Sequence, residues 1–127
     1  IKRVGRDELL DQSDVVSLNC ALTEETERMI GEEELRRLGG GEGGYLINTA
    51  RGELIDQDAL VTVLRDKSIA GAALDVFEQE PLPAEDPLTD LDSVILGSHN
   101  AQNTHKAVER THERAVNNLI SCLVNDI

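Results

Sequence analysis

Aromatic residues, cysteine, proline and positive charge are all scarce in this sequence. Tyr45 and Phe77 are the only Phe, Tyr or Trp residues in 127, so the core must be built from Leu, Val, Ile and Ala. Lys and Arg number 12 against 25 Asp and Glu, which gives a net charge of −13. A surface this acidic repels phosphate backbones and anionic lipid headgroups, so we expect binding neither to nucleic acid nor to membrane surfaces.

Two further absences concern membrane spans and metal sites. No apolar run approaches the roughly 20 residues of a membrane-spanning helix, and no charged-then-apolar signal segment opens the chain. Cys20 and Cys122 lie in apolar surroundings without the spacing of metal ligands, and two thiols do not make a disulfide framework. The sequence therefore predicts one acidic domain without a metal site, and a reducing cytoplasm is its expected location.

Apolar segments of strand length alternate with helical segments along the chain. Four of these apolar segments are short enough for buried strands. They lie at residues 15–18, 45–48, 69–74 and 93–97. The alternation is typical of an α/β fold in which right-handed crossovers build a parallel sheet, and we expect both faces of that sheet to be covered.

Capping residues and the spacing of apolar side chains predict the helices. From Thr104 onward, Val108 and the apolar residues after it recur at helical spacing, which predicts an amphipathic helix of about twenty residues. Asp56 is the expected N-cap of a helix that ends near Arg65, and Thr23 is the expected N-cap of a first turn. Shorter helices are expected at residues 7–12 and 32–38, a flexible turn at the glycine-rich residues 39–44, and a loop at residues 78–87.

Charged and reactive side chains follow the predicted strands, where a parallel sheet binds its ligands. Arg51 follows the second strand, and its planar guanidinium suits a carboxylate; the alternative is a surface arginine in an ordinary salt bridge. Asp75 follows the third strand, where it could instead cap a turn. His99 follows the fourth strand and Glu80 lies in the acidic loop; a structural histidine and a solvated carboxylate are their alternatives. Together, the four indicate proton transfer to or from a substrate that bears its own carboxylate.

Five segments follow one another in a distinctive order: Ser13–Leu18, Asn48–Gly52, Ala72–Phe77, Glu80–Pro81 and finally His99. In sequence and order they resemble the D-isomer-specific 2-hydroxyacid dehydrogenases, and within that family the phosphoglycerate and glycerate dehydrogenase-like members. The resemblance covers essentially the whole chain. It implies an α/β fold, a partial Rossmann-type parallel sheet with flanking helices that ends in a long amphipathic helix. It also implies an oxidoreductase that transfers a hydride between NAD or NADP and a small 2-hydroxy or 2-oxo acid.

The same resemblance implies a role for each of the four side chains. Arg51 would grip the carboxylate and keto oxygen of a 2-oxo acid, and His99 would protonate the carbonyl oxygen as the hydride arrives from the nicotinamide. Glu80 would orient the histidine and favour its protonated form, and Asp75 would lie near the nicotinamide carboxamide. The cofactor-binding residues that the resemblance implies are Cys20, Thr49, Ala50, Arg51, Asp75, His99, Asn100, Ala101 and Gln102.

The chain also departs from the family pattern. No G-x-G-x-x-G sequence follows a strand, and the glycine run at residues 39–44 precedes one. We therefore expect residues 1–127 to be the second half of an NAD(P)-binding domain, without the phosphate-binding loop and the substrate domain. NAD and NADP remain alternatives, as does the identity of the acid. Family members are commonly dimers, so a second copy of the chain is a further candidate partner.

Two interpretations of different classes are compatible with these observations. The intact Arg51, Glu80 and His99 favour descent from a working oxidoreductase. The missing phosphate loop favours a catalytically silent chain, truncated or used as an interaction module that retains the fold. An acidic adaptor for cationic partners is a third interpretation, which no motif supports. We expect the isolated 127 residues to be inactive by themselves.

We predict that the isolated chain binds NADH weakly. Helix N-terminal amides behind a glycine-rich loop normally hold the pyrophosphate, and this sequence has no such loop. Isothermal titration calorimetry of the 127-residue chain with NADH should give a dissociation constant on the order of 1 mM or weaker. A micromolar constant would show that this chain holds a phosphate site that its sequence does not reveal.

Overall fold

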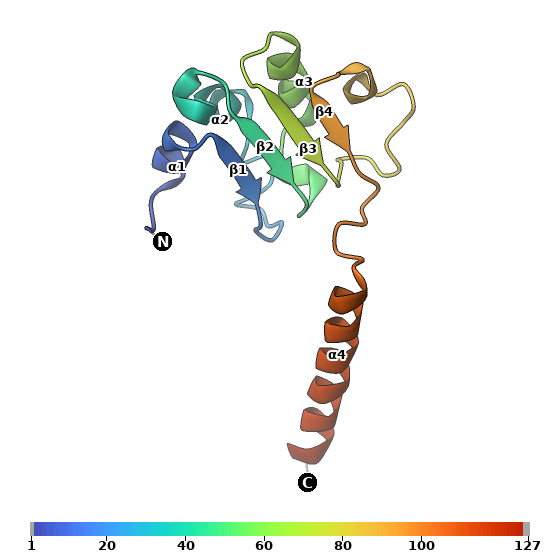
Figure 1. Ribbon diagram of the computed structural model, residues 1–127. Coiled ribbons are helices and arrows are strands. Elements are labelled where there is room, and N and C mark those ends of the chain that lie inside the picture. The colour runs from blue at the N-terminus through green and yellow to red at the C-terminus, as the bar shows by residue number, and fades with distance from the viewer. Residues whose placement is uncertain (1, 126–127) are drawn as a thin grey trace.

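A computed structural model describes residues 2–125 and shows one parallel sheet (Figure 1). Its four strands follow one another across the sheet in the order β1-β2-β3-β4. They are β1 (Val15–Leu18), β2 (Tyr45–Asn48), β3 (Gly71–Leu74) and β4 (Val94–Leu96). The predicted parallel α/β fold is confirmed. Strand β3 begins later than expected because Ile69 and Ala70 form the bend that leads the chain into the sheet.

The helices also follow the sequence prediction closely. They are α1 (Arg6–Gln12), α2 (Glu32–Arg37), α3 (Gln57–Arg65) and α4 (His105–Asn125), with 3₁₀ turns η1 (Leu38–Gly41), η2 (Gly52–Leu54) and η3 (Pro87–Asp90). Asp56 is the N-cap of α3, because its Oδ1 accepts a hydrogen bond from the Ala59 N–H at 3.0 Å. In the glycine-rich segment, Gly39 and Gly40 both have a φ of 67°, the left-handed conformation that favours glycine.

The turn expected after Thr23 forms but does not continue as a helix. The N–H of Glu27 donates to the Thr23 carbonyl at 2.9 Å, which closes one turn. Arg28 then adopts a φ of 48°, and a left-handed residue cannot extend a right-handed helix. The chain instead runs on to Ile30, which forms a single parallel bridge with Ile55.

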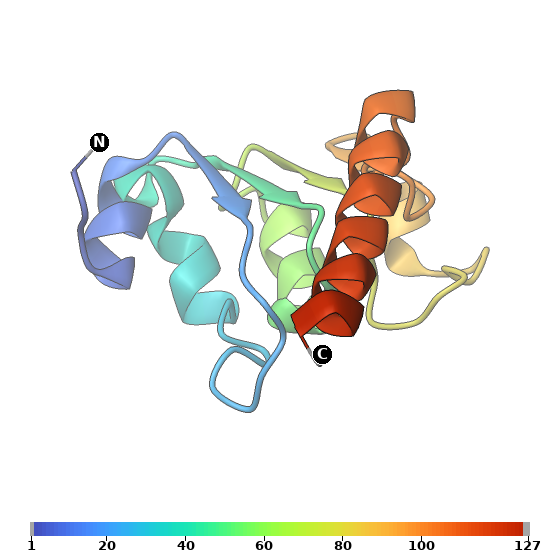
Figure 2. The ribbon, with the colours of Figure 1, turned by 90° about the horizontal axis from the view of Figure 1, so that it is seen from below.

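The core lies on one face of the sheet. Val16, Leu18, Leu46 and Leu74 are buried there in one cluster with apolar side chains of α2 and α3. Figure 2 shows these two helices on the same side of the sheet. Right-handed crossovers between strands that advance in one direction place every crossover helix on the same face.

The expectation that both faces are covered is therefore wrong for residues 2–125. On the open face, the exposed fractions are 52% for Val15, 53% for Tyr45 and 73% for Ile95. Covering a second face requires a reversal of strand order, because only then do right-handed crossovers pass on the other side. The described strands contain no such reversal.

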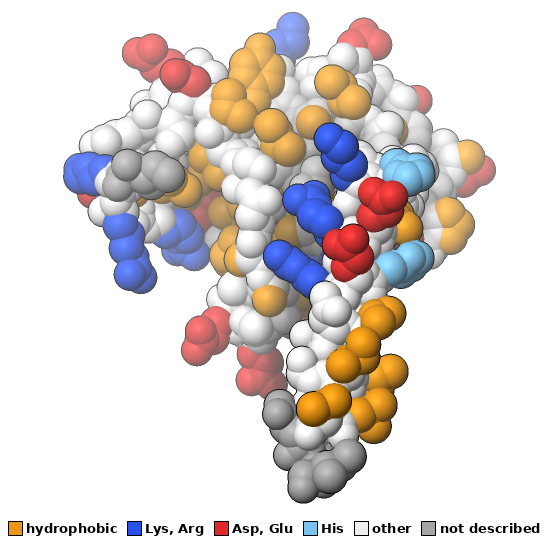
Figure 3. All heavy atoms as spheres, turned by 60° about the horizontal axis from the view of Figure 1, so that its bottom comes forward, with side chains coloured by type: hydrophobic (Ala, Val, Ile, Leu, Met, Phe, Trp, Pro, Cys, Tyr) orange, Lys and Arg blue, Asp and Glu red, His pale blue; other side chains and the backbone are white. Residues whose placement is uncertain are grey.

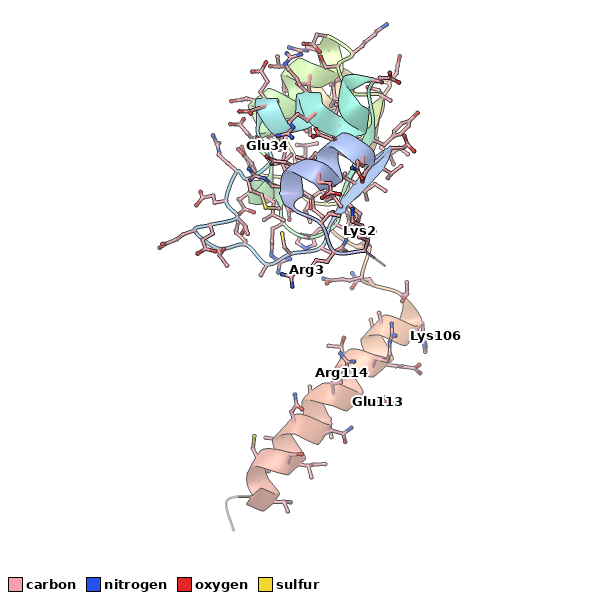
Figure 4. All side chains as sticks on the ribbon, turned by 90° about the vertical axis from the view of Figure 1, so that its left-hand side faces the viewer. Lys2, Arg3, Glu34, Lys106, Glu113 and Arg114 are labelled. Carbon is pink, nitrogen blue, oxygen red and sulfur yellow. The ribbon has the colours of Figure 1, made fainter. Side chains whose placement is uncertain are left out.

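Helix α4 extends away from the sheet as a separate arm (Figure 1). The predicted amphipathic pattern is confirmed, since hydrophobic side chains gather along one side of this helix (Figure 3). The large exposed apolar residues of α4 are Val108, Val116, Leu119, Ile120, Leu123 and Val124. Figure 4 shows that Lys106, Glu113 and Arg114 of α4 stand apart from Lys2 and Arg3 at the start of the chain. None of the helices within residues 2–125 combines the length and apolar character that crossing a bilayer requires.

Candidate active site

The carboxyl ends of the strands bring two functional loops together. Strands β2 and β3 pair in parallel with Asn48 opposite Leu74, so the loops that follow them start side by side. The Asp75 N–H then donates to the Asn48 carbonyl at 2.9 Å, which extends the pairing by one residue. Gly52 lets the loops stay close, because a Cβ at that position would overlap with the carbonyl group of Phe77.

Arg51 is presented to solvent by a loop that Asn48 shapes from within. The Asn48 side chain is fully buried; its Oδ1 accepts from the Ala50 N–H at 3.0 Å and its Nδ2 donates to the Arg51 carbonyl at 2.8 Å. The Arg51 guanidinium donates through Nη1 to the Ala50 carbonyl at 2.6 Å. Among residues 2–125 no carboxylate forms an ion pair with Arg51, unlike Arg28, Arg36 and Arg37. The guanidinium is therefore available to an external anion.

His99 and Glu80 form a direct pair, as the resemblance implied. Nδ1 of His99 lies 2.7 Å from Oε2 of Glu80, and the other carboxylate oxygen accepts from the Phe77 N–H at 3.1 Å. The hydrogen bond from His99 is the main cause that lowers the pKa of Glu80 below its ordinary 4.5. Both side chains are partly exposed, at 39% for His99 and 36% for Glu80. They border a hollow of about 290 Å³ that is also lined by Phe77, Pro81, Leu82, Gly97 and Ser98.

Asp75 holds the turn that carries His99. Its carboxylate accepts from the N–H groups of Asn100 at 3.1 Å and Ala101 at 2.8 Å, while its carbonyl accepts from the His99 N–H at 2.8 Å. The bond from Ala101 is the largest cause of a pKa below the ordinary 3.8, and desolvation by burial opposes it. A Cβ at Gly97 would overlap with Oδ1 of Asp75, so glycine is needed there. Asp75 therefore caps a turn, which is the alternative that the sequence offers for this residue.

The implied cofactor-binding residues fall into three places. Cys20, Thr49, Ala50 and Arg51 share a hollow of about 470 Å³ with Asn19, Ala21 and Leu22, between the ends of β1 and β2. His99, Asn100 and Ala101 form the turn on Asp75 at the far side of the same sheet edge. Gln102 lies apart from both, in a hollow with the first turns of α4.

Asn48 is the residue of this site that the sequence did not single out. It belongs to the Asn48–Gly52 segment that carries the resemblance, but within this segment the resemblance implies roles only for Thr49, Ala50 and Arg51. A polar residue that ends an otherwise apolar strand is the signal that could have identified it. Such a side chain must find partners when it is buried, and the first loop residues are the groups within reach.

Comparison with known proteins identifies the chain. A family model described as the NAD-binding domain of the D-isomer specific 2-hydroxyacid dehydrogenases matches residues 1–101. The chain belongs to this family. The matched residues include all four strands and the loops that carry Arg51, Asp75, Glu80 and His99. The resemblance seen in the sequence is thereby confirmed, and with it the Rossmann-type, NAD-binding nature of the domain.

Individual members of the 2-hydroxyacid dehydrogenase family match most of this chain. Glyoxylate reductase from Thermofilum pendens is 50% identical over 121 residues, which are 95% of this chain and 35% of that protein. The crystal structure of a glyoxylate reductase from Paecilomyes thermophila is 42% identical with a TM-score of 0.83, over 93% of this chain and 35% of that one. The structure of D-lactate dehydrogenase from Aquifex aeolicus, complexed with NAD and lactic acid, is 36% identical with a TM-score of 0.79. The match covers 97% of this chain and 41% of that one. The chain thus spans about a third of the length of its curated relatives.

We predict that Asp75→Asn loosens the histidine turn of this chain without unfolding it. The new NH₂ group is itself a donor, and it would face the N–H of either Asn100 or Ala101. That N–H would lose its acceptor. Amide exchange at Asn100 and Ala101, measured by NMR, should accelerate about tenfold or more, while Leu46 in the buried sheet stays protected. The exposed Asp92→Asn is the matched control. Unchanged exchange at both amides would contradict the assigned contacts.

The same bonds give the turn a defined dependence on pH. The pKa of Asp75 is lower in the fold than its ordinary 3.8, so the carboxylate stabilises the fold fully above that value. This contribution is lost as the pH falls through the lowered pKa. In the parent chain, the protection of Ala101 should therefore stay constant from neutral pH to about pH 5 and decrease only in stronger acid.

Proposed function

We propose that this chain supplies the nicotinamide-binding and catalytic residues of an NAD(P)-dependent oxidoreductase that interconverts a small 2-oxo acid and its 2-hydroxy acid. The observation that carries the proposal is the 2.7 Å His99–Glu80 pair at the same sheet edge as Arg51, which forms no ion pair within residues 2–125. The names of the relatives agree with it, since they include glyoxylate reductases and a D-lactate dehydrogenase. The missing phosphate-binding loop and substrate domain would then be supplied by a longer protein.

The hollow beside Arg51 fits the nicotinamide end of the cofactor. Its volume of about 470 Å³ suits a small ring with its ribose, and its lining combines the apolar Ala21, Leu22 and Ala50 with the polar Asn19, Thr49 and Arg51. The bound cofactor would supply the hydride that adds to the carbonyl carbon of the 2-oxo acid. The chain's own residues bind the acid and supply the proton.

In the proposed reaction His99 supplies that proton. A carboxylate only accepts hydrogen bonds, so the contact with Glu80 requires the hydrogen on Nδ1 and leaves Nε2 as the atom that faces the substrate. In the reducing direction Nε2–H of the imidazolium gives its proton to the carbonyl oxygen as the hydride reaches the carbon. In the oxidising direction the neutral Nε2 removes the hydroxyl proton. Glu80 fixes the ring and stabilises its charged form.

In the proposed reaction Arg51 binds the carboxylate of the acid. Its guanidinium presents a planar pair of N–H donors, and it forms no ion pair among the described residues. Bidentate binding would also hold the neighbouring keto group in one orientation relative to His99. Glyoxylate and hydroxypyruvate, the acids in the names of two groups of relatives, are the first substrates to test.

Two further properties belong to the same proposal. A cytoplasmic location agrees with the free Cys20 and Cys122. A homodimer agrees with the apolar side of α4, whose residues Leu119, Ile120 and Leu123 are more than half exposed. Cross-linking and sedimentation of the longer protein would test the dimer.

A chimaera tests the function directly. The matching segment of Thermofilum pendens glyoxylate reductase, 50% identical over 121 residues, would be replaced by this chain. We expect the folded chimaera to oxidise NADH or NADPH when glyoxylate or hydroxypyruvate is added. A chimaera with a native circular dichroism spectrum that turns over neither acid with either cofactor would contradict the proposal and favour the catalytically silent alternative.

We predict that Arg51→Lys in this chimaera impairs substrate use more than cofactor binding. Lysine keeps the charge but loses the two-pronged geometry of the guanidinium. The kcat/KM for the 2-oxo acid should fall by about 100-fold, which corresponds to about 2.7 kcal/mol, while the KM for NADH changes less than about twofold. Arg65→Lys at the exposed end of α3 is the control. Turnover within twofold of the parent would exclude Arg51 as the carboxylate anchor.

We predict that Glu80→Gln changes the pH profile of the reductive reaction. In the parent, the pKa of Glu80 is below its ordinary 4.5, so the carboxylate stays charged from mild acid upward and stabilises the imidazolium. Reduction should hold at low pH and fall as the imidazole loses its proton. The variant's falling limb should move to lower pH, and its kcat at neutral pH should drop about tenfold. Glu85→Gln, in the same acidic loop, is the control. Superimposable pH profiles for Glu80→Gln and the parent would contradict the proposed action of Glu80 on His99.

A further inference from the structure

Asn48 is the most completely buried polar side chain at the candidate active site. Its exposed fraction is 0%, and it is the last residue of β2. Oδ1 accepts from the Ala50 N–H at 3.0 Å, and Nδ2 donates to the Arg51 carbonyl at 2.8 Å. Its backbone carbonyl accepts from Asp75 at 2.9 Å. One buried residue therefore contacts both loops of the site.

The side chain of Asn48 defines the shape of the loop that presents Arg51. The Arg51 carbonyl also accepts a longer hydrogen bond, at 3.4 Å, from the backbone N–H of Leu54. The guanidinium itself bonds within this loop, to the Ala50 carbonyl. A side chain at position 48 that could not bond would leave the Ala50 N–H without this acceptor and the Arg51 carbonyl with only the longer bond from Leu54. The loop would then have to move to replace the lost hydrogen bonds.

The same residue connects Arg51 with His99. The Asn48 side chain donates to the Arg51 carbonyl, and the Asn48 backbone carbonyl accepts from the Asp75 N–H. The Asp75 carbonyl in turn accepts from the His99 N–H. The proposed reaction needs the carboxylate anchor and the proton donor at a fixed separation, because one small acid must contact both. The buried Asn48 and Asp75 can fix that separation, because their bonded polar groups have few alternative partners.

We propose that Asn48 is a positioning residue that holds Arg51 in register with His99 for binding of the 2-oxo acid. The expected effect of Asn48 on binding of the acid rests on the proposed function. Its effect on the shape of the Arg51 loop does not depend on that function. Asn48 acts through Arg51 and does not touch the substrate. Its removal therefore affects binding of the acid, whereas loss of a purely structural residue lowers stability and all kinetic constants together.

The first arm of the test uses the 127-residue chain. Asn48→Leu keeps the branched shape of the side chain without its hydrogen bonds, and Asn48→Ala, which also cannot accept or donate, is the second variant in case leucine does not fold. We expect amide exchange at Ala50, measured by NMR, to accelerate about tenfold or more while Leu46 and Leu74 remain protected. Asn117→Leu on the exposed α4 is the control. Unchanged exchange at Ala50 in a folded variant would overturn the proposal, whatever the chimaera does.

The second arm is a double-mutant cycle in the chimaera with glyoxylate reductase. Asn48→Ala alone should raise the KM for glyoxylate about tenfold, more than it changes the KM for NADH, with the pH profile nearly unchanged. In the Arg51→Lys background, Asn48→Ala should change the KM for glyoxylate by less than about a further twofold, because the residue acts through Arg51. Additive losses would overturn the positioning role. An inactive parent chimaera would instead contradict the proposed function, and the first arm would then decide the role of Asn48.

Discussion

The parallel pairing of β2 with β3 is the constraint on which the site depends. It places Asn48 opposite Leu74, and the next residue, Asp75, bonds to the Asn48 carbonyl. Two loops far apart in the sequence therefore leave the sheet at the same point, one with Arg51 and the other leading to Glu80. The third component, His99, arrives from β4 and is held by the backbone and side chain of residues that follow β3. A shift of one residue in this register would move Arg51 relative to His99 and would turn the buried side chains of β2 to the open face.

Two carboxylates of this acidic chain serve the histidine in different ways. Asp75 is buried, and both of its oxygens accept backbone N–H groups, so its charge stabilises a turn. Glu80 is more exposed and contacts the imidazole itself. Hydrogen bonds lower the pKa of both groups, which keeps both charged at neutral pH. The remaining acidic residues that the structure describes include ion-pair partners of arginines on α2, such as Glu32 and Asp11, and these lie away from the site.

Most of the fold follows from the sequence, because its signals are local. Apolar runs predicted β1 and β2 to the residue, Asp56 predicted the start of α3, and helical spacing predicted α4. The coverage of the sheet was not predicted correctly, since it depends on the direction in which strands are added and not on their composition. The pairing of Glu80 with His99 was accessible only through the resemblance, because 19 residues separate them. Asn48 was missed because its role appears only when its burial and its partners in the following loop are known.

Glu80 holds Nδ1 of His99, and in the proposed reaction this leaves Nε2 for the substrate. The ¹⁵N spectrum of the imidazole rings in the 127-residue chain tests this most directly, with His112 on the exposed α4 as an internal reference. For neutral His99 the geometry predicts the tautomer that carries its hydrogen on Nδ1, since the carboxylate 2.7 Å away can only accept. The proposed roles of Glu80 and His99 require this tautomer in the parent chain. They make no demand on the tautomer of His99 in Glu80→Gln. A neutral His99 with its hydrogen on Nε2 would show that Glu80 does not hold the ring, and the assignment of His99 as the proton donor would lose its structural basis.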